Sequence, residues 1–201
     1  MPGTRSIELP VADRDEIEGM NTRTRLDVLR AEARSSHEWL RAIVEDVTPA
    51  QASWQPPGRA NTIAATYAHI VRNQDEDMNH GFLGRPMLSE GTWRGKTGLP
   101  SWWSDSDKNE WEVDAPIDWL VLRSYGDAVG AWVIEAVDQL TEDDLDKVAK
   151  LTTPDRPRWF GIDVVRLTVG RHVWMHGGEI ACLKGLQGEK GYQSGLDTFR
   201  E

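Results

Sequence analysis

The chain has 201 residues, of which 39% are hydrophobic and 28% charged, and its formal net charge is −10. This composition predicts one soluble globular domain, and the acidic balance argues against nucleic acid or an anionic lipid surface as a partner. No run of eighteen apolar residues is present to span a membrane, and the polar N-terminus lacks the apolar segment of a secretory signal. The single cysteine, Cys182, excludes an internal disulfide and fits a reducing cytoplasm. We expect it to be a small buried hydrophobic residue.

Residues 1–20 form a predicted flexible leader. Helical spacing of apolar residues then predicts a first helix over 23–46, and "TPAQ" (Thr48–Gln51) predicts a capping box with proline at the first helical position. A second helix is expected over 62–79. Beside its apolar face runs a polar stripe of the same period: Thr62, Thr66, His69, Asn73 and Glu76. Such a stripe on a core-forming helix indicates a face that either is exposed to solvent or lines a functional site.

Residues 81–113 show no clear periodicity and contain four of the ten tryptophans: Trp93, Trp102, Trp103 and Trp111. A structureless segment of this length within a compact domain is typically a lid or a binding loop. We therefore expect a long Trp-rich loop between the second and third long helices. Its Trp93, Trp102 and Trp103 would pack over the bundle end and hold a substrate or cofactor.

A third helix is predicted to open at Asp114 or Ala115 with Pro116 at its start. Its expected apolar stripe is Ile117, Leu120, Val121, Tyr125, Ala128, Trp132, Ala136 and Leu140. "TEDD", from Thr141, predicts the cap of a short helical turn, and a last long helix is expected over 162–186, with Gly185 and Gly188 placed to end it. No strand-like alternation bounded by a hairpin turn is found. The fold class predicted is all-α, an antiparallel four-helix bundle over 21–188 followed by a polar tail over 189–201.

The stretch "RHVWMHGGEI" places His172 and His176 four residues apart. On a helix this spacing leaves a rotation of only about 40°, so both imidazoles can converge on one cation. A third ligand must come from another helix, and His69 is the best candidate because its polar stripe should face the core. Glu179 lies nearly on the same face and is the candidate catalytic residue. It could accept an N–H from a liganding ring or act as a base.

A metal-free interpretation of the histidines is also open, because five histidines scattered at random give such a pair roughly one time in ten, which makes the spacing alone a weak signal. Gly177 and Gly178, adjacent in mid-helix, favour a place where backbone or ligand comes close. We expect His37 to be a half-buried structural histidine and His80 to interact with a helix C-terminus.

"NTIAATYAHIVRNQDEDM" and, about a hundred residues later, "RHVWMHGGEIACLKGLQG" carry a family resemblance. Together with the helix order and the "LTEDDL" segment, they resemble the DinB-like (YfiT-like) metal-dependent enzyme superfamily over roughly residues 23–187. The resemblance implies a four-helix bundle with a divalent metal held by His69, His172 and His176. Members of that superfamily include thiol S-transferases and thiol-dependent isomerases that use mycothiol or bacillithiol. The chain departs from it in the Trp-rich insertion and has no second catalytic domain, which disfavours a sulfoxide-synthase role.

Three hypotheses of function follow. The leading one is transfer of a low-molecular-weight thiol, such as mycothiol, deprotonated at the three-histidine metal, to a small-molecule electrophile. A second is hydrolysis by metal-activated water with Glu179 moving protons. A third is a non-catalytic metal-binding or dimerisation bundle, with a homodimer as its assembly. Arg72 and Arg171 neighbour the histidines and could contact an anionic group, although helical phase turns each about 100° away.

The metal itself is left open by the sequence. Three histidines suit Zn, Ni or Fe(II), and affinity order alone does not select among them. If Glu179 or Glu76 replaced one histidine, the resulting two-histidine, one-carboxylate site would favour iron and oxygen chemistry.

Overall fold

The computed structural model of the chain describes residues 23–99, 117–150 and 158–192. The predicted leader lies outside these residues, as does the tail beyond Tyr192. Within them, regular structure is helical apart from one isolated antiparallel bridge between Val148 and Phe160, which confirms the all-α class. None of the described helices combines the length and apolar character needed to cross a membrane.

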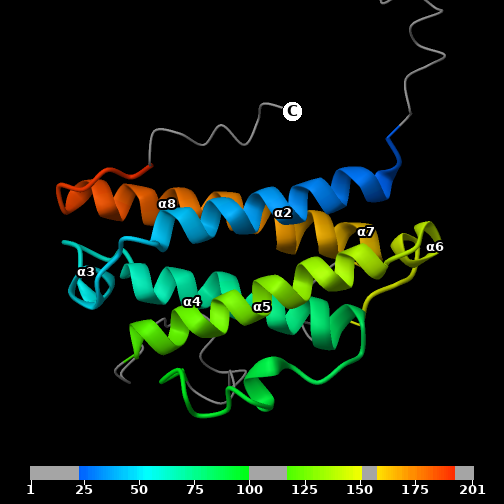
Figure 1. The fold of residues 1–201 in the computed structure, drawn as a ribbon, viewed down its shortest axis with the longest axis horizontal. Coiled ribbons are helices and arrows are strands. Elements are labelled where there is room, and N and C mark those ends of the chain that lie inside the picture. Colours follow the sequence, from blue (N-terminus) through cyan, green and yellow to red (C-terminus); the bar gives the residue numbers. More distant parts are fainter. Residues whose placement is uncertain (1–22, 100–116, 151–157, 193–201) are drawn as a thin grey trace, which may run out of the picture.

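Four long helical runs form the bundle (Figure 1). Their bounds are α2 Arg25–Val44; α4 Ile63–Gln74, continued by the π-helix η1 Asp75–Phe82; α5 Trp119–Gln139; and α7 Gly161–Val164, η3 (π-helical) Val165–Arg171 and α8 His172–Leu186. Shorter elements are α3 Pro49–Ser53, the 3-10 turn η2 Leu88–Glu90 and α6 Glu142–Leu145. Helices α2 and α4 each pack against both α5 and α8, so the four helices lie at the corners of a square.

The helix directions correct the prediction of an antiparallel bundle. Helices α2 and α5 are antiparallel: Trp119 Nε1, at the start of α5, donates to Val47 O just after α2, at 2.8 Å. Helices α2 and α8 run in the same direction, since Ser36 Oγ donates to Val169 O and, further along both helices, Lys184 Nζ donates to Ile43 O. Figure 1 shows α4 and α5 also running in the same direction. The long connection between them allows this, because it carries the chain back along the bundle before α5 begins.

Side-chain caps set most helix starts where the sequence predicted them. Thr48 and Thr141 form capping boxes at α3 and α6, and the Thr62 side chain accepts from Ala65 N at the start of α4. The predicted start of the third helix was wrong. Helix α5 begins at Trp119, because the Asp118 carboxylate accepts from two backbone N–H groups of its first turn.

The apolar face predicted for this third helix was also only partly right. Tyr125 and Ala136 are buried as expected, but Leu120 is 61% exposed. The buried face of α5 instead consists of Trp119, Leu122, Tyr125, Gly126, Val129, Gly130, Val133, Ala136 and Val137. Because apolar residues occur on several sides of this helix, their spacing alone does not fix which side packs inward.

A buried carboxylate anchors the first part of the connection that follows η1. Asp75 is fully buried and accepts hydrogen bonds from Leu88 N at 2.9 Å, Ser89 N at 2.8 Å and the Tyr125 hydroxyl at 2.7 Å, and another from Asn79 Nδ2. Burial and the adjacent carboxylate raise the pKa of Tyr125, so its phenol stays protonated and donates. The loop predicted to be a lid is thus held at Leu88 and Ser89 to η1, next to Tyr125 of α5.

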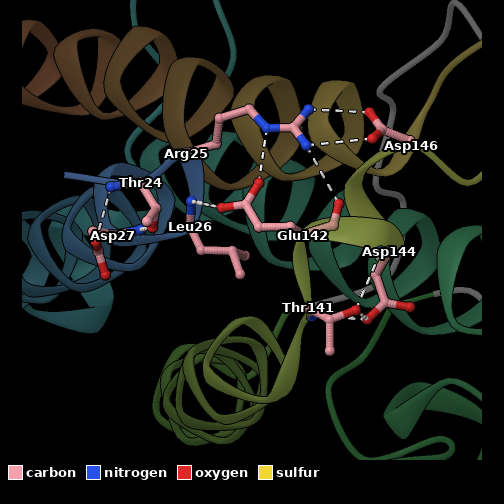
Figure 2. A network of polar contacts seen from close by, with 8 residues as sticks. All are labelled: Thr24, Arg25, Leu26, Asp27, Thr141, Glu142, Asp144 and Asp146. Carbon is pink, nitrogen blue, oxygen red and sulfur yellow. Dashed lines mark hydrogen bonds and ion pairs between the residues drawn. The ribbon is translucent and has the colours of Figure 1, made fainter. Parts of the chain in front are cut away.

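A second polar network joins the start of α2 to α6 at the bundle end (Figure 2). Arg25 reaches Glu142 Oε2 through Nε at 2.8 Å and Asp146 Oδ1 through Nη1 at 3.0 Å. The Arg25 guanidinium lowers the pKa of Asp146. Glu142 also accepts from Leu26 N at 3.3 Å. These groups are exposed, so we expect the network to set the position of the α6 turn more than the stability of the fold.

The glycines and the cysteine of α8 have different surroundings from those expected. A Cβ on Gly177 would overlap the Trp39 ring of α2, whereas one on Gly178 would meet no atom within 4 Å. Helix α8 continues through Gly185 to Leu186, and Gly188, with φ of +85°, follows its end. The prediction of a buried Cys182 was wrong, since this residue is exposed.

The Tyr125→Phe substitution should test the Asp75 anchor. It removes one donor to a buried carboxylate and should lower the free energy of unfolding by about 2 kcal/mol, measured by urea denaturation. Tyr192→Phe is the matched control, because Tyr192 is 56% exposed and the change should have little effect. Equal stability of the two variants would show that the Tyr125 hydroxyl contributes nothing.

The adjacent glycines of α8 provide a second matched pair. Gly178→Ala should stabilise the protein by up to about 1 kcal/mol, because alanine favours a helix and the space is open. Gly177→Ala gains the same propensity but forces Trp39 to move, so it should destabilise by about 1–2 kcal/mol. Thermal and urea unfolding measure both changes. If Gly177→Ala were as stable as Gly178→Ala, the contact with α2 would not limit this position.

Candidate metal site

Three imidazoles meet between α4 and α8. His69 comes from α4, and His172 and His176 come from successive turns of α8. One ring nitrogen of each lies within 4.8 Å of those of the other two, and the ring centroids are 4.5–4.6 Å apart. All three side chains are partly buried. The structure therefore brings together the three histidines that the sequence predicted to converge.

The local backbone near these histidines is unusual on both helices. The π-helix η1 begins at Asp75, six residues after His69, and η3 ends at Arg171, immediately before His172. Thr168 of η3 donates its hydroxyl to Asp77 Oδ2 of η1 at 3.0 Å, and both residues are buried. Widened π-helical turns are rare and are found frequently at functional sites. The hydrophobic spacing predicted ordinary α-helix here, because a π-helical turn leaves no clear mark on that spacing.

Neighbouring side chains hold two of the rings. His176 Nδ1 lies 2.8 Å from Glu179 Oε2, so Nδ1 carries the donated proton and Nε2 is available to a ligand. Asn73 Nδ2 lies 3.3 Å from His172 Nε2, and the same His172 nitrogen lies 2.9 Å from His69 Nε2. Asn73 is one helical turn beyond His69. Its amide therefore reaches the point on which the rings converge.

The cluster forms one wall of a cavity of about 380 Å³. The other lining residues are Asn73, Asp77, Trp159, Leu167, Thr168, Arg171 and Met175. Trp159, Leu167 and Met175 provide apolar surface, while Arg171 and Asp77 carry the charges. The site thus combines a nitrogen donor set with room for a small molecule beside it.

The geometry of the nitrogens fits a divalent metal. Metal–nitrogen bonds of 2.0–2.1 Å in a tetrahedral site separate two ligand nitrogens by about 3.3 Å. His69 Nε2 and His172 Nε2 are 2.9 Å apart, so they would move apart by a few tenths of an ångström when both bind the ion. Three neutral imidazoles leave at least one coordination position open, as catalytic sites require. Within the described part of the chain, these histidines form the one group of three or more potential ligands that is close enough to share an ion.

The model of the DinB superfamily matches residues 25–180, a span that includes all three histidines. This chain belongs to the DinB superfamily. No curated protein matches it. Family membership agrees with the helical bundle and with a metal-binding site at His69, His172 and His176.

The remaining predicted site residues lie in different places in this DinB-superfamily chain. Trp93 does not line the cavity; its ring packs 5.8 Å from that of Tyr125, on α5. Trp102 and Trp103 lie outside the described residues. Trp159, which was not among the predicted site residues, does line the cavity. It precedes α7 in a segment without periodicity, so no sequence signal pointed to it.

The two arginines next to the candidate ligands in sequence, and the two other histidines considered above, also lie in different surroundings. Arg72 is buried near Asp75 and Glu76, and burial lowers its pKa, whereas Arg171 lines the cavity although helical phase disfavoured it. His37 is half-buried and lies between Ala33 O, at 2.7 Å, and Gln74 Oε1, at 3.1 Å, as expected for a structural residue. Burial lowers the pKa of His37. His80 is exposed in the last turn of η1.

Proposed function

We propose that the protein is a metal-dependent enzyme that transfers a low-molecular-weight thiol, such as mycothiol, to a small electrophile bound in the cavity. The observation that carries this proposal is the convergence of His69, His172 and His176 on one wall of a cavity large enough for a substrate. The superfamily resemblance supplies the thiol chemistry. A homodimer and a cytoplasmic location stay predictions from the sequence.

The three imidazoles would hold a divalent ion, which supplies a Lewis acid that favours the thiolate form of a bound thiol. The chain's own residues orient and enclose the reactants. Glu179 accepts a hydrogen bond from the Nδ1–H group of His176 and so fixes the tautomer and direction of that ring. This makes Glu179 a positioning residue in the proposal. Asn73 lies beside the ligand nitrogens and can hydrogen-bond a group held there.

In the overall reaction, the thiol releases its proton to the solvent and its sulfur bonds to the electrophilic carbon. The bond from that carbon to the leaving group breaks, and the leaving group departs with the bonding electron pair. The apolar side chains of Trp159, Leu167 and Met175 suit the body of such an electrophile and limit the access of water.

The hydrogen bonds of the two nearby carboxylates favour thiol transfer over hydrolysis as the proposed reaction. Asp77 accepts from the Thr168 hydroxyl, and Glu179 accepts from His176. Glu179 does not line the cavity, and Thr168 holds the Oδ2 atom of Asp77, so the proposal assigns neither carboxylate the role of base toward an attacking water molecule.

The metal site can be tested by titrating the chelator-treated protein with Zn²⁺. We expect a single tight site per chain. His69→Ala or His176→Ala should each weaken zinc binding by more than about 100-fold. Loss of a residue that only hydrogen-bonds a metal ligand already weakens metal binding by about 10- to 100-fold, and loss of the ligand itself should cost more. His80→Ala is the control, since His80 is exposed and outside the cluster, and it should bind normally. No tight site in the wild type would rule out the proposal.

The reaction can be tested by measuring consumption of mycothiol in the presence of an activated aryl chloride. The rate should require both the thiol and the metal and should fall to background in His69→Ala. An activated ester offered without any thiol is the contrasting substrate. Metal-dependent cleavage of the ester, with no thiol transfer, would instead support the hydrolase hypothesis.

A further inference from the structure

We infer that the ligand bound beside the three histidines carries an anionic group that Arg171 binds, joined to an apolar body. This inference rests on the proposed function and specifies the class of molecule that the site accepts. It is carried by the charge and the shape of the cavity lining.

The two charged side chains of the lining are in different situations. Asp77 is 8% exposed and accepts a hydrogen bond from the buried Thr168 hydroxyl. Arg171 is exposed, lines the cavity, and forms no ion pair or hydrogen bond through its side chain with any other described residue. The acid is therefore engaged within the wall, while the guanidinium is available to a ligand. A guanidinium presents a planar set of donors that matches a carboxylate or a phosphate.

The neighbouring surface is apolar. Met175 lies four residues after Arg171, so the two side chains occupy the same side of the helical run, and Met175 is 50% exposed. Trp159 and Leu167 add aromatic and aliphatic area to the same cavity. A cavity lined by an exposed methionine and a tryptophan is suited to hold an apolar group.

The position of Arg171 explains why helical phase gave the wrong expectation. In a regular α-helix, adjacent residues point about 100° apart, which would turn Arg171 away from the direction of His172. The backbone at Arg171 is α-helical, with φ of −51° and ψ of −44°, so this phase holds. Arg171 and Met175 form one column along the helix and His172 and His176 form the next, and the cavity is wide enough to be lined by both columns.

Two thiol probes that differ in a single group can test this. They are 2-benzyl-3-sulfanylpropanoate and its primary amide, which both offer a thiol for the metal and a benzyl group for the apolar wall. The protein is loaded with Co²⁺, so the thiolate-to-cobalt charge-transfer band reports coordination of each probe. The carboxylate should bind about tenfold more tightly than the amide, in keeping with one charge-assisted hydrogen-bonded pair.

Substitutions assign this preference to Arg171. Arg171→Gln should bind cobalt normally and should bind both probes with equal affinity, while Arg171→Lys should recover part of the preference. Arg166→Gln is the matched control, because Arg166 is exposed on the same η3 segment but does not line the cavity. It should behave as the wild type does.

The outcomes separate this inference from the proposed function. Absence of the charge-transfer band with both probes would overturn thiol binding at the metal, and this inference with it. A band with both probes at equal affinity in the wild type would overturn the inference alone. So would a preference for the carboxylate that persists undiminished in Arg171→Gln.

Discussion

The antiparallel contact between α4 and α8 is the constraint on which the candidate site depends. It places His69 opposite the turn of α8 that carries His172 and His176, and the buried hydrogen bond from Thr168 to Asp77 fixes the register of the two helices beside them. A shift of one residue along either helix would turn a ring away, since neighbouring residues point about 100° apart. The three-histidine cluster is thus a consequence of how two helices pack, and the cavity lies where their regular packing is interrupted by the π-helical segments.

The rest of the bundle keeps these two helices in place from the other side. Gly177 brings the backbone of α8 close to Trp39 of α2 at the level of His176, and Lys184 is buried against the C-terminal carbonyl of Ile43. At the start of η1, which continues α4, the buried Asp75 ties the backbone of the following loop to Tyr125 of α5. Apart from the Thr168–Asp77 hydrogen bond, the residues that make these contacts do not line the cavity. Most residues of the cavity wall can therefore differ in chemistry, and so in what they bind, without loss of the contacts that hold the helices together.

Much of the fold could be predicted because its signals are local. Threonine caps at Thr48 and Thr141 were read correctly, since the cap residue and its partner are three residues apart in sequence. The start of α5 and its buried face were not, because that helix is apolar on several sides and only its neighbours decide which side is covered. Cys182 was misplaced for the same reason: its residue type suits the core, but its position on α8 faces outward.

The sequence by itself determined the helical class, the family, and the pairing of His172 with His176, because each of these depends on spacing within one segment or on short motifs in order. Only the tertiary structure decided that α2 and α8 run in the same direction, that Arg171 and Trp159 line the cavity, and that Trp93 does not. These features depend on contacts between residues far apart in the chain. Such contacts are set by the packing of whole helices, which a local pattern of residues does not encode.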